Sequence, residues 1–155
     1  MNTLPDDSSA TLPPAANWLG YGGLLPFITL APASLLDDHH ALFFGDALFA
    51  YGAVILSFLG ALHWGFAMTA SGLDAGQRKA CIIWSVIPAL LAWPALLLAP
   101  PFASLLLLVG FSAAYWQDRR LAKMAGLPAG YLVLRFRLTL VACLCLAAGA
   151  FSACL

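Results

Sequence analysis

Five long apolar stretches follow one another along this chain, and short polar or proline-containing breaks separate them. An α-helix needs about 20 mainly apolar residues to cross a bilayer, and each stretch approaches or exceeds that length. The pattern therefore predicts an all-α fold, an integral membrane bundle of five transmembrane helices. The expected spans are roughly 16–35, 43–69, 80–99, 102–118 and 132–153.

The breaks are chemically suited to the membrane surface. Two aspartates and two histidines (37–40) end the first stretch, glycines and an aspartate (72–77) end the second, and Pro100-Pro101 ends the third. Charged and turn-forming residues cannot stay unsolvated in hydrocarbon. Because proline lacks a backbone N–H, Pro26, Pro88 and Pro94 should kink their helices and free carbonyls that neighbouring groups or hydroxyls can satisfy.

Composition supports a lipid environment. Of the 155 residues, 63% are hydrophobic and 9% are charged, and a soluble domain of this length exposes too much surface to bury so much apolar material. We expect residues 1–14 to form a disordered tail and residues 15–155 to form the transmembrane domain. The tail lacks the basic residues of a secretory signal or a transit peptide. This favours a multi-pass protein of the bacterial inner (plasma) membrane over an organellar precursor.

The basic residues all fall on one side of the predicted layout. They occupy the second loop, the fourth loop and the start of the last span: Arg78, Lys79, Arg119, Arg120, Lys123, Arg135 and Arg137. Basic loops stay in the cytoplasm, so we expect a cytoplasmic N-terminus and a C-terminus outside. The basic residues form no stripe with aromatic rings, and nucleic-acid binding is therefore not expected.

Small residues on the second span predict its packed face. Ala53, Ser57 and Ala61 recur every four residues, a spacing that lets membrane helices approach closely. Trp64 falls on the same face and His63 lies about a quarter turn away. The opposite side should face lipid, and its residues are Leu48, Ile55, Phe58, Leu59, Leu62 and Phe66.

A polar cluster is expected near the cytoplasmic ends of three helices. Its candidate members are His63, Trp64, Tyr115, Gln117, Asp118, Arg135 and Thr139. Arg135 shares a face with Thr139 and small residues, so it should turn inward and pair with Asp118, while Arg137 reaches the headgroups. Three roles fit the cluster. It could be a structural network that sets the register of the helices, or a surface for a protein partner. It could also be a site that binds a quinone, a lipid headgroup or another small ligand, or that handles a proton.

No motif supports catalysis or a bound cofactor. The chain has no GxSxG, HExxH, P-loop or GxGxxG motif and no glutamate, so it is not expected to be an enzyme. His39 and His40 lie at the opposite membrane face from His63, which argues against a haem held by two histidines of one chain. The cysteines have no metal-binding spacing and are expected to pack as small hydrophobic residues. We therefore expect no metal and no cofactor.

Four segments together carry a resemblance to a known family. They are LGYGGLLPF (19–27), YGAVILSFLGALHWGFAM (51–68), WSVIPALLAW (84–93) and GLPAGYLVLRFRLT (126–139). These segments resemble the family of small multi-pass membrane proteins that includes transmembrane protein 69. The resemblance implies a multi-pass inner-membrane domain. The family has no assigned biochemical function, so it supplies no catalytic or binding residues.

Two functions remain open on this evidence. The first is a non-enzymatic structural or accessory subunit whose partners are the lipid bilayer and either another membrane protein or a second copy of the chain. The alternative is the binding or transport of a small ligand, a quinone or a lipid, in a cytoplasmic-side polar pocket around His63.

Overall fold

The computed structural model describes residues 13–37, 39–70, 72–125 and 129–153. Within these ranges the chain is all-α, with no strand, and its helices are α1 (Pro14–Gly22), α2 (Leu25–Leu36), α3 (Ala41–Thr69), α4 (Ala75–Ala95), α5 (Pro100–Ala125) and α6 (Ala129–Ser152). Most of the tail predicted over residues 1–14 lies outside the described residues, and α1 begins at Pro14.

Each predicted span is found as helix, although the first is divided between α1 and α2. Three stretches are long and apolar enough to cross a membrane, namely Pro14–Leu36, Ala41–Thr69 and Gly130–Ser152. The other two long helices hold shorter apolar runs. α4 starts with a polar turn and ends while the apolar run continues, and α5 ends in a charged segment.

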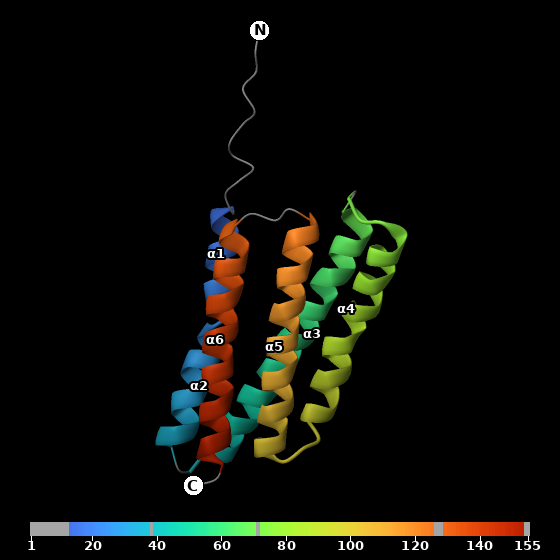
Figure 1. Cartoon of the computed structure of the whole chain (residues 1–155). Coiled ribbons are helices and arrows are strands. Elements are labelled where there is room, and N and C mark those ends of the chain that lie inside the picture. Colours follow the sequence, from blue (N-terminus) through green and yellow to red (C-terminus); the bar gives the residue numbers. More distant parts are fainter. Residues whose placement is uncertain (1–12, 38, 71, 126–128, 154–155) are drawn as a thin grey trace.

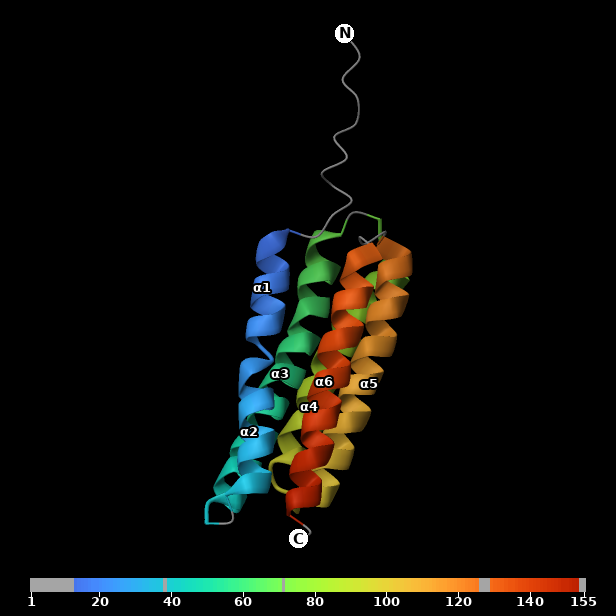
Figure 2. The same ribbon diagram turned by 90° about the vertical axis from the view of Figure 1, so that its left-hand side faces the viewer.

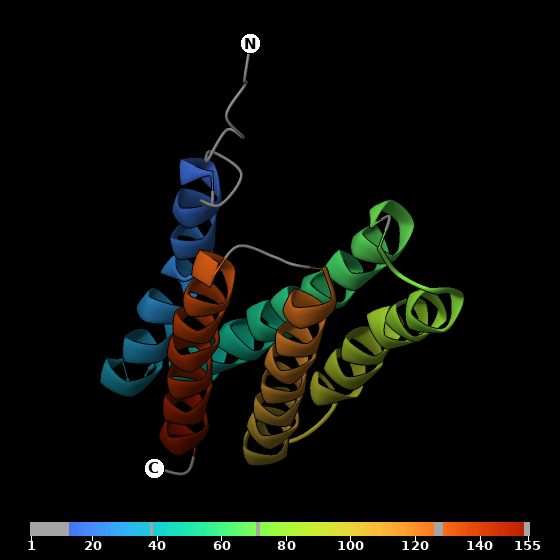
Figure 3. The ribbon, with the colours of Figure 1, turned by 45° about the horizontal axis from the view of Figure 1, so that its top comes forward.

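α3 is the central helix of the bundle. α1 and α2 follow one another along one edge, and α6, α5 and α4 lie in a row beside them (Figure 1). α3 crosses behind this row at a tilt (Figure 3) and contacts α2, α4, α5 and α6. The buried core follows the crossing and includes Leu48, Leu56, Leu107, Phe111 and Leu146. The start of α1 and the end of α6 lie at opposite ends of the bundle (Figure 2).

The break between α1 and α2 lies at Gly23 and Leu24. Pro26 follows in the first turn of α2. The missing N–H of proline is tolerated there because the N–H groups of the first turn have no acceptor within the helix. The Gly23 carbonyl oxygen accepts a hydrogen bond from the Tyr51 hydroxyl of α3 at 2.9 Å. Instead of the predicted kink within one helix, the structure has a break between two helices, and the Tyr51 hydroxyl bonds a carbonyl in this break.

α3 and α4 approach each other closely at Gly60. A Cβ atom at this position would overlap the Ser85 carbonyl oxygen and come within 3.2 Å of the Pro88 ring. Pro88 is itself buried inside α4. The absence of a side chain at Gly60 therefore allows the backbone of one helix to touch the other, as in close packing between membrane helices.

The packed face of α3 differs from the predicted one. Ala53 is buried as predicted, but Ala61 is exposed and Trp64 is 49% exposed, so the prediction that these two lie on the packed face is wrong. Leu48 and Leu59, predicted to face lipid, are buried. The prediction assumed that the small residues of this helix all lie on a single packed face. Because the tilted α3 contacts four helices, its leucines are needed to fill the wider gaps between them.

All seven basic residues lie near one end of the bundle, called here the basic end, where α4 and α6 begin and α5 finishes. Arg78 donates from Nη1 to the Ala67 carbonyl and from Nη2 to the Ala70 carbonyl, the latter at 3.0 Å. These contacts satisfy carbonyls in the last turn of α3, which have no helical donor. Asp74 and Gln77 form a reciprocal capping box at the start of α4.

Candidate functional site

A buried polar cluster joins three helices about two turns inside the basic end. Asp118 of α5 accepts a hydrogen bond at Oδ2 from Arg135 Nε of α6 at 2.6 Å. Its other oxygen, Oδ1, lies 3.4 Å from His63 Nε2 of α3. The side chains of Asp118 and Arg135 are 2% and 8% exposed, and that of His63 is 1% exposed. One carboxylate therefore links α3 and α6 through α5.

His63 contacts both its own helix and Asp118. Nδ1 lies 3.2 Å from the Leu59 carbonyl oxygen, and Nε2 faces Asp118 Oδ1 at 3.4 Å. Each ring nitrogen of this buried side chain is therefore close to an oxygen that accepts hydrogen bonds.

A cavity of about 570 Å³ lies beside the cluster, between α1, α2, α3 and α6, and Phe111 of α5 also lines it. Its walls are mainly aliphatic and aromatic, and they include Leu59, Leu62 and Leu138 together with Phe27, Phe58 and Phe111. This volume falls in the range of small-molecule sites in proteins. The cavity is therefore large enough for an apolar molecule.

Three polar side chains on α6 line the same cavity. Tyr131, Arg135 and Thr139 are spaced by four residues and so lie on one helix face. The Tyr131 hydroxyl, Arg135 Nη2 and Thr139 Oγ1 are buried and have no hydrogen-bond partner among the described residues. These atoms have almost no accessible surface, so the three residues line the cavity mainly through their apolar atoms.

The Thr139 hydroxyl does not bond its own helix. Thr29, Ser57 and Thr69 each donate to the carbonyl four residues earlier in their own helix, at 2.8–2.9 Å. This local bond is common for hydroxyls in helices. Thr139 does not make it, although it is only 8% exposed. Its hydroxyl is therefore a buried donor that has no partner among the described residues.

The structure brings some of the predicted cluster together and leaves other members outside. His63, Asp118 and Arg135 meet, and the predicted pairing of Arg135 with Asp118 is confirmed. Thr139 lies one turn further along α6 on the cavity wall. Arg137 points outward and contacts the Tyr21 hydroxyl of α1 at 3.3 Å.

The other predicted members, Trp64, Tyr115 and Gln117, do not join this group. Trp64 is exposed, Tyr115 packs its ring against Phe136 of α6 at 5.7 Å between centroids, and Gln117 is half-buried. Tyr131 was not among the predicted members, because it lies near the start of the last span, where aromatic rings often mark the membrane interface. Its four-residue spacing from Arg135 was the signal that could have identified it.

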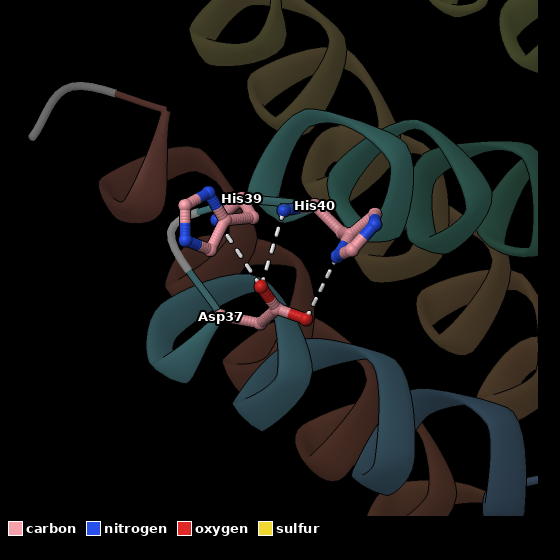
Figure 4. Close-up of polar contacts among 3 residues, drawn as sticks. All are labelled: Asp37, His39 and His40. Atoms are coloured by element: carbon pink, nitrogen blue, oxygen red, sulfur yellow. Dashed lines mark hydrogen bonds and ion pairs between the residues drawn. The ribbon is translucent and has the colours of Figure 1, made fainter.

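A second polar group lies at the other end of the bundle, in the turn between α2 and α3. Asp37 Oδ1 accepts hydrogen bonds from the backbone N–H groups of His39 and His40 at 3.1 and 3.2 Å, and Oδ2 lies 3.0 Å from His40 Nδ1 (Figure 4). The hydrogen bond with the His40 ring lowers the pKa of the Asp37 carboxyl below its usual 3.8. Asp38 lies outside the described residues. Both carboxylate oxygens of Asp37 form their contacts within the turn, so these contacts are explained by the local structure of the turn.

The described cysteines are unpaired, and Cys81 is buried while Cys143 and Cys145 are half-buried. Cys154 lies outside the described residues. The buried thiol of Cys81 packs with Ala67, Leu73 and Leu121 near the basic end. This environment agrees with the expected role as small hydrophobic side chains.

Comparison with known proteins supports the resemblance carried by the four sequence segments. A family model described as a protein of unknown function (DUF3429) matches residues 12–151. The chain is also similar to Transmembrane protein 69 of Xenopus tropicalis, with 38% identity over 135 residues that cover 84% of this chain and 51% of that protein. The chain therefore spans about half the length of this curated relative. No solved structure matches it.

Proposed function

Since the chain belongs to the DUF3429 family of membrane proteins, we propose that it is a five-span, non-enzymatic inner-membrane protein that binds a small amphipathic molecule in the cavity beside Arg135. The observation that carries this proposal is the cavity of about 570 Å³, an apolar space whose lining residues also include Tyr131, Arg135 and Thr139. An apolar cavity with a few convergent polar groups is the usual form of a ligand site.

The energetic argument favours an occupant. A buried hydrogen-bonding group without a partner costs about 1–3 kcal/mol, and the wall of α6 carries such atoms on Tyr131, Arg135 and Thr139. Packing alone would be served better by apolar residues at these positions. The apolar part of an amphipathic molecule would fill the cavity, and movements of these side chains would bring their polar atoms to its head.

We propose that the basic end faces the cytoplasm, with the N-terminus inside and the C-terminus outside. The seven basic residues at this end support that orientation through the positive-inside rule. They should also attract anionic lipid headgroups. The ligand site would then lie in the cytoplasmic half of the inner membrane.

The outer face of α4 favours a second candidate function, the accessory-subunit role. α4 packs on α3 and α5 at the edge of the bundle, and its far side presents Ile83, Val86, Leu90 and Trp93. A helix of another membrane protein, or of a second copy of the chain, would fit such an apolar face. Contacts of this kind would be compatible with a ligand site on the opposite side of the bundle.

Native mass spectrometry of the full chain, extracted gently from its own membrane, tests the ligand proposal. Ala16 lines the cavity and the neighbouring Ala15 is exposed, so Ala16→Trp should block the cavity while Ala15→Trp serves as the matched control. We expect the wild type and Ala15→Trp to retain a small lipophilic molecule that Ala16→Trp loses.

Two results would contradict the ligand proposal. One is a wild-type protein that is free of small molecules, and the other is retention that is equal in both variants. A ligand-free chain recovered with a second polypeptide would move the assignment to the accessory-subunit role. Equal thermal unfolding of the two variants in detergent checks that the Trp substitutions leave the bundle folded.

A further inference from the structure

We propose that the outer face of α5 binds an anionic phospholipid. The headgroup phosphate contacts three basic side chains at the end of the helix, and the acyl chains lie along the apolar part of the same face. This site is separate from the cavity beside Arg135, so the inference does not depend on the ligand proposed for that cavity. The three basic side chains, called here the α5 patch, are Arg119, Arg120 and Lys123.

The α5 patch is a compact group on one side of the helix. At about 100° per residue, its three members and Trp116 fall within an arc of about 100°. All four side chains are exposed, and together they line a hollow of about 220 Å³. Their positive charges therefore face the surroundings of the bundle from one place.

No carboxylate pairs with the α5 patch within the part of the chain that the structure describes. The ion pairs there involve Asp37 and Asp118, which lie in the turn at the far end and in the buried cluster, and Asp74 caps the start of α4. Positive charges that gather on a surface attract an anion. A phosphate group suits arginine in particular, because two of its oxygens can accept from the N–H groups of one guanidinium.

Trp116 places the α5 patch at the level of the lipid headgroups. Its ring is 52% exposed, and the guanidinium carbon of Arg120 lies over the ring at 3.6 Å from the centroid. Exposed tryptophans are typical of the membrane–water interface. The cation–π contact holds the guanidinium at this level without cancelling its charge.

The same face of α5 continues as an apolar stripe toward the other end of the helix. Phe102, Leu105 and Val109 lie on the side of Trp116, and each is more than half exposed. α5 packs on α3, α4 and α6, and Figure 1 shows it in front of α3 with α4 and α6 at its sides. Apolar side chains, an aromatic ring and three cations therefore follow one another in the order of the chains, the interface and the headgroup of a phospholipid.

An anionic lipid fits this face better than other sources of phosphate. A zwitterionic lipid would bring its own cation toward the α5 patch. A soluble phosphate would leave the apolar stripe uncovered.

Native mass spectrometry of the purified full chain in detergent, titrated with single lipids, tests the inference. The probe is palmitoyl-oleoyl phosphatidylglycerol, and the comparator is palmitoyl-oleoyl phosphatidylcholine, which has the same chains and a zwitterionic headgroup. We expect the first lipid to bind saturably and about tenfold more tightly than the second. Glycerophosphoglycerol, the same headgroup without chains, should bind about a hundredfold more weakly than phosphatidylglycerol.

Charge-matched variants show whether the site is local. Arg119→Gln with Lys123→Gln removes two charges from the α5 patch, and Lys79→Gln with Arg137→Gln removes two charges from other helices at the same end. All four side chains are exposed, so both variants should fold, and equal thermal unfolding checks this. We expect phosphatidylglycerol binding to weaken about tenfold to thirtyfold in the first variant and less than about threefold in the second.

Four results would overturn the inference. Equal weakening in the two double variants would show only a general attraction by the basic end, and equal binding of the two lipids would show that the headgroup charge is not recognised. A second polypeptide that binds the wild type in place of the lipid, and is lost from the patch variant, would assign the face to a protein partner. Ala16→Trp should bind phosphatidylglycerol like the wild type, and a loss there would place the lipid in the cavity instead.

Discussion

Asp118 gives the polar cluster its stability because one carboxylate has partners on two other helices. Arg135 occupies one oxygen at 2.6 Å, and His63 approaches the other at 3.4 Å. A charged group in this position is expensive unless it is paired. The cluster therefore stabilises the bundle mainly by keeping each charge compensated, whatever molecule lies in the cavity.

Substitution of Asp118 tests this dependence. Asp118→Asn should lower the free energy of unfolding by about 3–5 kcal/mol, because it leaves the Arg135 guanidinium buried without a counter-charge. Arg135→Gln combined with Asp118→Asn should be less damaging than the sum of the two single changes. Reversible unfolding in mixed micelles measures both. A loss below about 1 kcal/mol, typical of exposed ion pairs, would contradict the buried pairing.

The turn at the opposite end offers a test by pH. Since the hydrogen bond with His40 lowers the pKa of Asp37, the ionised carboxyl stabilises the folded turn above pH 3.8, and this contribution is lost as the pH falls through the lower folded pKa. The amide proton signals of His39 and His40 should therefore titrate with a midpoint below 3.8. Asp37→Asn should abolish the transition, and a midpoint above 3.8 in the wild type would refute the assigned hydrogen bond.

At the scale of the helices, the packing of α3 combines two kinds of contact. It touches α4 through backbone at Gly60, and it fills the space toward α5 and α6 with leucine side chains such as Leu48 and Leu56. The distance between a tilted helix and its neighbours changes along its length. Small residues are therefore needed where a neighbouring helix is close, and large side chains are needed where it is further away.

A glycine substitution tests the close approach of α3 and α4. Gly60→Ala should destabilise the protein by about 1–3 kcal/mol, because the new methyl group meets the Ser85 backbone, which cannot move aside as a side chain would. Gly65→Ala is the matched control on the same helix, since nothing lies within 4 Å of its Cβ position. Thermal unfolding in detergent compares the two. Equal stability of both variants would show that the helices can separate at no cost.

At the scale of the whole molecule, charge and cavity are arranged along the same axis. The basic residues gather at one end, and the polar cluster lies about two turns further in. Moving toward the other end, the cavity passes from Arg135 and Thr139 to apolar walls that include Ala142. A molecule with a polar head and an apolar tail has one favourable orientation in such a gradient.

Cysteine labelling tests the proposed orientation. In a variant that lacks the native cysteines, His39→Cys should react with a membrane-impermeant maleimide in intact bacterial cells, because its turn is exposed at the outer face. Gly72→Cys, exposed at the basic end, should react only after permeabilisation. The reverse pattern would place the basic end outside and contradict the positive-inside assignment.

The sequence by itself determined the helical segments, the end of the bundle that carries the basic residues and the pairing of Arg135 with Asp118. Runs of apolar residues, helix-breaking residues and the need to neutralise a charge are local properties that composition and spacing record. Pro26 predicted an irregularity in the first span, although not its division into two helices at Gly23 and Leu24. These features depend on solvation and backbone chemistry within one helix.

Only the tertiary structure decided which face of α3 is buried, that Trp64 lies outside the cluster, and that Tyr131 and Thr139 share a cavity with Arg135. A helical wheel shows which residues share a face of one helix. It does not show how that helix is tilted in the bundle or how many helices pack against it. The cavity forms where α1, α2, α3, α5 and α6 fail to pack fully against one another, and the widths of such gaps are set by these helices together.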